Sequence, residues 1–197
     1  MKKLILVAFL TSSLSIFAQT EMGTWMIQGD TNLSLTGVAS EFEYDGKSTG
    51  LETSVGTFEF NPAVSYFVAD NLAIGLGLEL SSTATEVETE FAKSETTSAA
   101  FAVMPQATYF FGSSRTRPYL GVELGLISTV TDDGNNEATF SGFGFGLNGG
   151  AAIFLSDNVS LNLGLEFAGA SLTDKDDDDY KMNLGGFGIT VGFGIFL

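Results

Sequence analysis

Large apolar residues alternate with small residues along the last part of the chain. Phe187, Ile189, Val191, Phe193, Ile195 and Leu197 alternate with Gly188, Thr190, Gly192 and Gly194. A period of two indicates a β-strand whose two faces meet different surroundings. A soluble sheet would carry charged side chains on its wet face, whereas a strand that spans a membrane turns its bulk toward lipid. The bare second face therefore favours a strand in contact with hydrocarbon.

The same alternation recurs in eight segments. Their bulky positions run over residues 25–35, 58–66, 72–80, 101–111, 120–126, 143–153, 159–167 and 187–197. Short links at 68–71, 112–117 and 156–158 interleave with long acidic connections rich in Ser, Thr and Gly. Bacterial outer-membrane barrels have this asymmetry of short periplasmic turns and long external loops, together with an even number of strands. The pattern predicts an all-β fold, an eight-stranded antiparallel up-and-down transmembrane β-barrel.

Two features of the strand ends refine this prediction. Aromatic residues gather near the short links, where an interfacial girdle is expected, and they are Trp25, Tyr66, Phe67, Tyr109, Phe111, Tyr119 and Phe154. Pro62 and Pro105 oppose the assignment, because each lies inside a strand pattern and a closed barrel has no free edge. We therefore expect bulges or local unpairing at both prolines.

The first 18 residues are predicted to be a secretory signal. Lys2 and Lys3 precede the apolar run from Leu4 to Leu10, and Ala18 supplies a small residue for cleavage. Cleavage there would leave a single barrel domain, residues 19–197. The chain has no cysteine, which excludes lipoprotein acylation, disulfides and thiol chemistry.

The chain combines a positive mean hydropathy of +0.24 with a formal net charge of -16. This charge argues against nucleic-acid binding. Glycine interrupts every apolar run after the signal, so a membrane-spanning form requires a closed barrel. Most of the acid lies in the predicted long loops, at Glu41, Glu43, Asp45, Glu86, Glu88, Glu90, Glu95, Asp132, Asp133 and residues 174–179.

The run from Asp174 to Asp179 opens like a calcium loop. Its sixth position is Asp179 where a Gly is needed, and its twelfth is Gly185 where a bidentate Glu is needed. We therefore predict no dedicated metal site. The acidic loops have two interpretations, namely divalent-cation binding that bridges them to lipopolysaccharide phosphates or a basic partner, or a solvated, self-repelling surface.

Four carboxylates fall at mid-strand positions of the face that carries small residues, at Glu59, Glu79, Glu123 and Glu166. Carboxylates inside a narrow barrel are costly unless they are paired, hydrogen-bonded or protonated. One interpretation is a cation path or a proton-sensitive lumen. The other is a structural network with Gln106, Asn148, Asn162, hydroxyl groups and water.

Three short segments carry a resemblance to a known family. They are Thr190–Leu197, Tyr66–Leu72 and Arg117–Gly121. The first resembles the C-terminal signal of barrels inserted by the outer-membrane assembly machinery, with Leu197 where an aromatic is usual. With the other two it makes the mature chain similar to small outer-membrane β-barrels of the OmpA, OmpX and OmpW type. The resemblance implies residence in the outer membrane, contact with its lipid and lipopolysaccharide, and insertion by that machinery, but carries over no active site.

The absence of histidine excludes the His-dependent mechanisms of outer-membrane lipases, acyltransferases and proteases. We expect that the protein has no enzymatic activity, binds no cofactor and is a monomer. Three functions stay open. The first is a structural or surface-interaction role through acidic extracellular loops, the second is a narrow pore or conduit for small solutes, and the third is a soluble periplasmic ligand-binding barrel.

Overall fold

The computed structural model describes residues 19–197 except 31–39, 45–46, 89–92, 135 and 178. The predicted signal, residues 1–18, lies outside the described residues. The strands in the described part are β1 (Trp25–Asp30), β2 (Ser40–Tyr44), β3 (Lys47–Ala69), β4 (Leu72–Glu88), β5 (Lys93–Phe110), β6 (Thr116–Asp132), β7 (Glu137–Phe154), β8 (Val159–Asp174) and β9 (Lys181–Phe196). In this part of the chain no helix has the length and apolar character needed to cross a bilayer.

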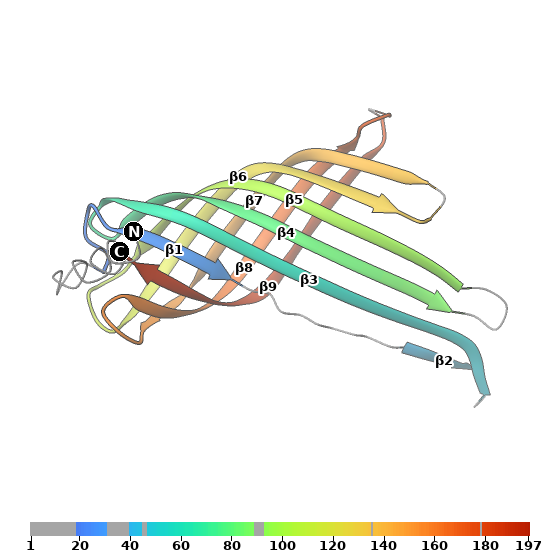
Figure 1. Cartoon of the computed structure of the whole chain (residues 1–197), viewed down its shortest axis with the longest axis horizontal. Coiled ribbons are helices and arrows are strands. Elements are labelled where there is room, and N and C mark those ends of the chain that lie inside the picture. The colour runs from blue at the N-terminus through green and yellow to red at the C-terminus, as the bar shows by residue number, and fades with distance from the viewer. Residues whose placement is uncertain (1–18, 31–39, 45–46, 89–92, 135, 178) are drawn as a thin grey trace, which may run out of the picture.

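The strands form one antiparallel sheet that closes on itself (Figure 1). Strands β3 to β9 pair in chain order, and β1 pairs with both β9 and β3 through Met26↔Phe196 and Trp25↔Tyr66. Strand β2 pairs with the opposite end of the same β3 edge, so β1 and β2 share one position around the barrel. The structure therefore confirms the predicted eight-stranded antiparallel barrel, with its first position divided between two short strands.

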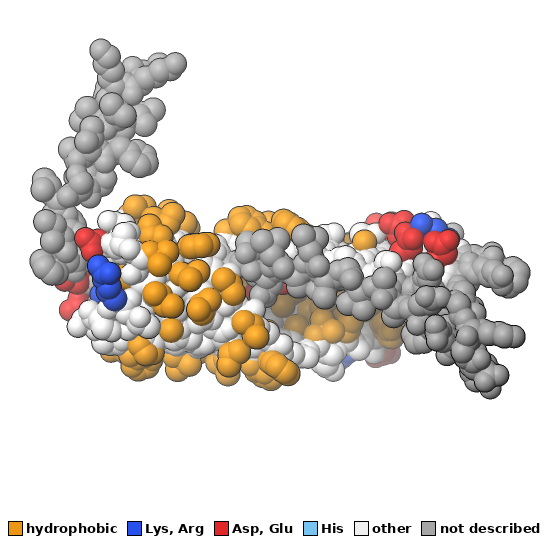
Figure 2. Space-filling model, turned by 90° about the horizontal axis from the view of Figure 1, so that it is seen from below, with side chains coloured by type: hydrophobic (Ala, Val, Ile, Leu, Met, Phe, Trp, Pro, Cys, Tyr) orange, Lys and Arg blue, Asp and Glu red, His pale blue; other side chains and the backbone are white. Residues whose placement is uncertain are grey.

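The bulky face of each strand points outward. Leu76, Leu163 and Phe193 are 47%, 41% and 55% exposed, whereas their neighbours Gly77, Asn162 and Gly194 are buried. Apolar side chains accordingly cover the outer wall toward one end of the molecule (Figure 2). A water-soluble barrel would reverse this arrangement, with apolar residues packed inside and polar residues outside. The distribution is that of a barrel whose wall contacts lipid.

The strands are longer than the sequence predicted. Outward positions of β4 are apolar up to Leu80 and then change to Ser82, Ala84 and Glu86, although the ladder with β5 continues to Glu88↔Lys93. Beyond the apolar positions, Ser and Thr side chains also form hydrogen bonds between neighbouring strands, as between Thr57 and Thr83 at 3.2 Å.

Several acidic residues assigned to loops are therefore strand residues. They are Glu41 and Glu43 in β2, Glu86 and Glu88 in β4, Glu95 in β5, Asp132 in β6 and Asp174 in β8. The prediction was wrong because polar, Thr-rich segments were assigned to loops, whereas Thr favours strands and the ladder continues beyond the apolar band. Asp45 and Glu90 lie outside the described residues.

Both prolines interrupt one ladder without shifting its register. The β3–β4 ladder skips Asn61 and Pro62 between Phe60↔Leu80 and Ala63↔Gly77, and the β5–β6 ladder skips Met104 and Pro105 in the same way. Each proline keeps its pairing on the other side, with β1 or with β4. The structure confirms local unpairing at these sites, and no bulge is needed because the absent N–H removes a single hydrogen bond.

Candidate functional site in the barrel lumen

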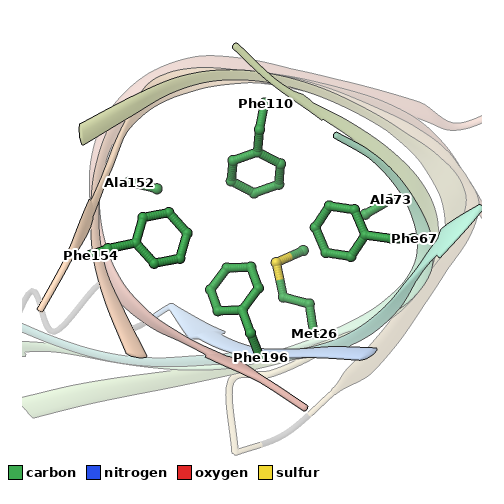
Figure 3. Close-up of a cluster of buried hydrophobic side chains, with 7 residues drawn as sticks. All are labelled: Met26, Phe67, Ala73, Phe110, Ala152, Phe154 and Phe196. Carbon is green, nitrogen blue, oxygen red and sulfur yellow. The ribbon is translucent and has the colours of Figure 1, made fainter. Parts of the chain in front are cut away.

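Large side chains fill the lumen at the end of the barrel that holds the C-terminus and the short links. Met26, Phe67, Phe110, Phe154 and Phe196 point inward from five strands and are at most 4% exposed (Figure 3). We call these five residues the aromatic plug. Its rings lie 5.0 Å apart for Phe154 and Phe196 and 5.8 Å apart for Phe67 and Phe110, within the range of favourable aromatic pairs. The plug fills this end of the lumen with a buried apolar core.

The prediction of an aromatic girdle was wrong for some of its residues, because they belong to the plug or pack against it. Trp25, Tyr109 and Phe111 are exposed on the outer wall, as predicted. Phe67 and Phe154, however, are 0% and 4% exposed and point inward. Tyr119 is also a correction, because it packs against the plug. The error arises because the girdle was predicted from closeness to the strand ends alone, whereas period two places neighbouring residues on opposite faces.

A buried arginine holds the N-terminal segment against this end. Arg117 is 8% exposed, and its guanidinium donates to Thr20 Oγ1 at 2.5 Å and to Gln19 Oε1 at 2.7 Å. Its Nε donates to the Ser114 carbonyl at 3.1 Å, and its charge lies 4.6 Å from the centre of the Phe154 ring. This cation–π contact joins the arginine to the plug. The sequence showed Arg117 only as part of a turn motif, because its partners are far away in the chain.

The backbone of the same segment is tied to the link between β3 and β4. The Thr20 hydroxyl donates to Asn71 Oδ1 at 2.6 Å, and Asn71 N donates to the Thr20 carbonyl at 2.6 Å. Phe67 exchanges backbone bonds with Gly23 and Thr24 at 2.9 Å each. Residues 19–24 thus form a strap across the closed end of the barrel.

All four predicted lumen carboxylates line cavities inside the barrel. A cavity of about 60 Å³ above the plug is lined by Glu79, Glu123 and Glu166. A second cavity of about 180 Å³, toward the opposite end, is lined by Glu59, Glu79 and Glu166. The fold therefore brings together four residues that are distant in the chain, in two cavities that share Glu79 and Glu166. Among the described residues, neither cavity has a lysine or arginine in its lining.

Neutral polar groups share the smaller cavity, as the network interpretation expects. Gln106, Asn148 and Asn162 all line it, Gln106 donates to Ser65 Oγ at 3.1 Å, and Ser160 Oγ donates to Asn162 Oδ1 at 2.8 Å. Sequence reasoning did not assign Gln28 a role, although it also lines this cavity and its Oε1 is buried with no hydrogen-bond partner among the described residues. The cavity is large enough for more than one water molecule by the usual criterion of about 10–15 Å³ each.

Glycines on the lumen face make room for these polar side chains. A Cβ at Gly146 would overlap Glu123 Oε1, and one at Gly121 would overlap Asn148 Oδ1. Glu123 pairs with Gly146 and Gly121 with Asn148 across the β6–β7 ladder. Each polar side chain therefore lies over the glycine opposite to it, which is the packing reason for the small residues of this face.

Backbone amides of the acidic turn after β8 donate hydrogen bonds to two of its carboxylates. Asp174 Oδ1 accepts from the amides of Asp176 and Asp177 at 2.8 and 3.2 Å, and Asp177 Oδ1 accepts from Asp179 N at 3.0 Å. Such Asx turns hold a loop without any ion. Among the described residues, no group of three or more potential ligands is arranged to hold a metal.

A family profile identifies the barrel. The profile of the outer membrane protein beta-barrel domain matches residues 4–194. The chain belongs to this family. It is an outer-membrane protein, and the closed end that carries the C-terminus and short links faces the periplasm.

Solved structures agree with the fold of this family. The outer membrane protein OprG from Pseudomonas aeruginosa has a TM-score of 0.50 and 16% identity over 92% of this chain and 99% of its own. The N-terminal β-barrel domain of OprF from the same organism has a TM-score of 0.52 and 13% identity over 89% and 98%. No curated protein sequence matches the chain significantly. At these identities the likeness concerns the fold alone.

Proposed function

We propose that this protein is a periplasmically closed barrel that acts at the cell surface through its acidic outer end. The observation that carries the proposal is the aromatic plug, together with the strap that Arg117 holds over it. A lumen closed by five side chains that are at most 4% exposed offers no passage to the periplasm. The part of the molecule available to partners is then the outer end, where the strands project past the apolar band.

The charge of this end indicates the chemistry of its partner. Glu88, Glu95, Asp132, Asp133, Glu137, Asp176, Asp177 and Asp179 are exposed there. Lys93 forms an ion pair with Glu86, with 2.7 Å between Lys93 Nζ and Glu86 Oε1. The hydrogen bond from Lys93 to Glu86 raises the pKa of Lys93. A dense negative surface attracts cationic partners and accelerates their encounter. We therefore assign the protein a basic protein or peptide as its surface partner.

The test is binding of a polycation to the barrel in nanodiscs. An octalysine peptide is titrated by calorimetry onto the wild type and onto the triple variant Asp176→Asn, Asp177→Asn, Asp179→Asn. The variant should bind at least fivefold more weakly, and the wild-type affinity should fall with salt because the surface charges are screened. Asp157→Asn, at a periplasmic turn, is the matched control and should match the wild type. Equal binding by all three proteins would reject the acidic end as the contact surface.

Divalent cations are a second class of partner for the same surface, as bridges to lipopolysaccharide phosphates. The exposed carboxylates of the outer end support this, since hard cations prefer oxygen ligands. Calorimetry with Mg²⁺ or Ca²⁺ at millimolar concentration should give heat that the triple variant reduces. A wild type without binding heat would remove the cations from the proposal.

Conduction is the second candidate function, and the run of lumen carboxylates is the observation that favours it. In planar bilayers, the closed-barrel proposal expects no conductance at neutral pH. A conduit would give cation-selective steps that disappear in the quadruple variant Glu59→Gln, Glu79→Gln, Glu123→Gln, Glu166→Gln. Such steps in the wild type would replace the surface role as the primary function.

A further inference from the structure

The outer wall of the barrel contains an apolar groove. It has a volume of about 870 Å³ and crosses β5 to β9, which is in the usual range of about 300–1,000 Å³ for ligand sites. The largest outward side chains along it are Leu124, Leu126, Phe143, Phe145 and Phe167. Closure of a sheet makes the outer wall of a barrel convex, so a hollow of this size requires that side chains be missing from the wall.

Two glycines form the floor of the groove. Gly169 and Gly185 are directly opposite each other in the β8–β9 ladder, and Gly169 is in turn opposite Phe145 of β7. One step along the same face toward the periplasm, the corresponding pair is Phe167↔Phe187. The Phe145 ring lies over Gly169, because a Cβ there would be 2.8 Å from Phe145 Cε1. At Gly185 an added Cβ would meet only the Ala168 carbonyl, at 3.7 Å, so the groove is open at that point.

The groove becomes polar toward the cell surface. At the end nearer the cell surface its lining includes Ser171 and Asn183, which pair across β8 and β9. The next pair on the same face toward the cell surface is Thr173↔Lys181. Lys181 is exposed and forms no ion pair with any described residue. The nearest turn carries the exposed Asp176, Asp177 and Asp179 together with Lys175, and its backbone amides donate to Asp174 and Asp177. The groove is thus apolar at mid-height and bears hydroxyl and amide groups toward the cell surface, and Lys181 lies one residue pair beyond its lining, beside the acidic turn.

We propose that this groove binds one phosphate-bearing lipid of the outer leaflet, with its acyl chains over Gly169 and Gly185 and its phosphate at Lys181. The order of apolar, polar and cationic groups along the groove follows that of such a lipid from its chains to its head group. A second copy of the barrel fits less well, because its convex wall would leave the hollow unfilled. The inference depends on the outer-membrane location and not on the proposed surface role.

The test measures lipid binding by native mass spectrometry of the full mature chain released from micelles. The probes are bisphosphorylated lipid A and phosphatidylethanolamine at equal concentration. The wild type should retain one lipid A per barrel, at least tenfold more tightly than phosphatidylethanolamine. Gly185→Leu should weaken the binding of both lipids at least tenfold because its side chain occupies the floor. Lys181→Glu should remove the preference for lipid A, because it weakens the binding of the doubly phosphorylated lipid more than that of the zwitterionic phosphatidylethanolamine.

Gly29→Leu is the matched control, because Gly29 is on the outward face of β1, where an added Cβ meets nothing within 4 Å. It should bind lipid A as the wild type does. Heat-modifiable migration on SDS gels confirms that each variant folds. If Gly185→Leu does not fold, the lipid preference of Lys181→Glu tests the proposal instead. Equal binding by Gly185→Leu and the control, absence of a lipid A preference in the wild type, or a lipid-free pair of barrels would each overturn the proposal.

Discussion

The two levels of the lumen contrast sharply, although the same strands build both. At the periplasmic end the inward residues are large and form a buried apolar plug, with Phe67 and Phe196 at most 1% exposed. A few residues further along the same strands the inward residues are glycines, amides and carboxylates around cavities of about 60 and 180 Å³. The alternation of outward and inward residues is the same at both levels. Only the size and polarity of the inward side chains change.

This difference means that the two levels contribute unequally to the stability of the barrel. The plug is an apolar core of the kind that stabilises soluble proteins, where each buried contact contributes and voids are costly. The carboxylate level holds polar groups that need partners or water, and its stabilisation depends on hydrogen bonds. Substitutions should therefore destabilise the barrel most at the plug and least at the carboxylates. Four variants test this order, each measured by urea unfolding of the refolded barrel in micelles.

The largest effect is expected at Phe110. Its ring contacts Phe67, Tyr119 and Phe196 with centroids 5.8–6.4 Å apart, and Phe110→Ala should lower the free energy of unfolding by about 3–5 kcal/mol through lost burial and a cavity. Phe101→Ala, on the same strand but 48% exposed on the outer wall, should cost less than about 1 kcal/mol by the membrane-insertion scale. Similar losses for the two variants would show that the plug is not the stabilising core.

The next effect is expected at the strap. Arg117→Ala removes the bonds to Thr20 and Gln19 and the contact with Phe154, and should cost about 2–3 kcal/mol, since hydrogen bonds of charged groups contribute about 1.5–3 kcal/mol. It should also release residues 19–24 to added protease. Arg115→Ala removes an exposed arginine from the same turn and should leave both properties unchanged. A protease-resistant strap in the Arg117 variant would contradict this assignment.

A smaller loss is expected from Gly150, at the boundary between the two levels. A Cβ there would overlap the Leu163 carbonyl of the neighbouring strand, so Gly150→Ala should cost about 1–3 kcal/mol by forcing the backbones apart. Gly188→Ala places its methyl group in open space of the same lumen face and should change stability by less than about 0.5 kcal/mol. If both variants unfold alike, strand spacing does not limit the packing of this face.

The smallest effect is expected at Glu79, which lines both carboxylate cavities. Glu79→Gln keeps the shape and removes one of several like charges, so stability should stay within about 1 kcal/mol of the wild type, with any change toward greater stability. The exposed Glu137→Gln is the control for loss of a surface charge. A larger loss at Glu79 would mean that its carboxylate makes bonds that an amide cannot replace.

The alternation of residues predicted the fold correctly because it follows from local geometry. Period two places Leu76 and Phe193 on one face and glycines on the other in any register, and lipid is the only surrounding that suits such an outer face. The four mid-strand carboxylates could also be placed in the lumen by parity alone. Parity also places Phe67 on the lumen face, opposite to Tyr66, but the girdle was predicted from closeness to the short links, which does not distinguish the two faces.

The amino-acid sequence by itself thus determined the strand type, the outward face and the membrane location, since each depends on residues close together in the chain. The tertiary structure decided which residues meet: the plug joins side chains from positions as far apart as Met26 and Phe196, and Arg117 binds residues 97 and 98 positions away. It also decided the groove, because Gly169 and Gly185 leave a hollow only when the ladder sets them opposite each other. Register and closure act over long distances, and no local pattern records them.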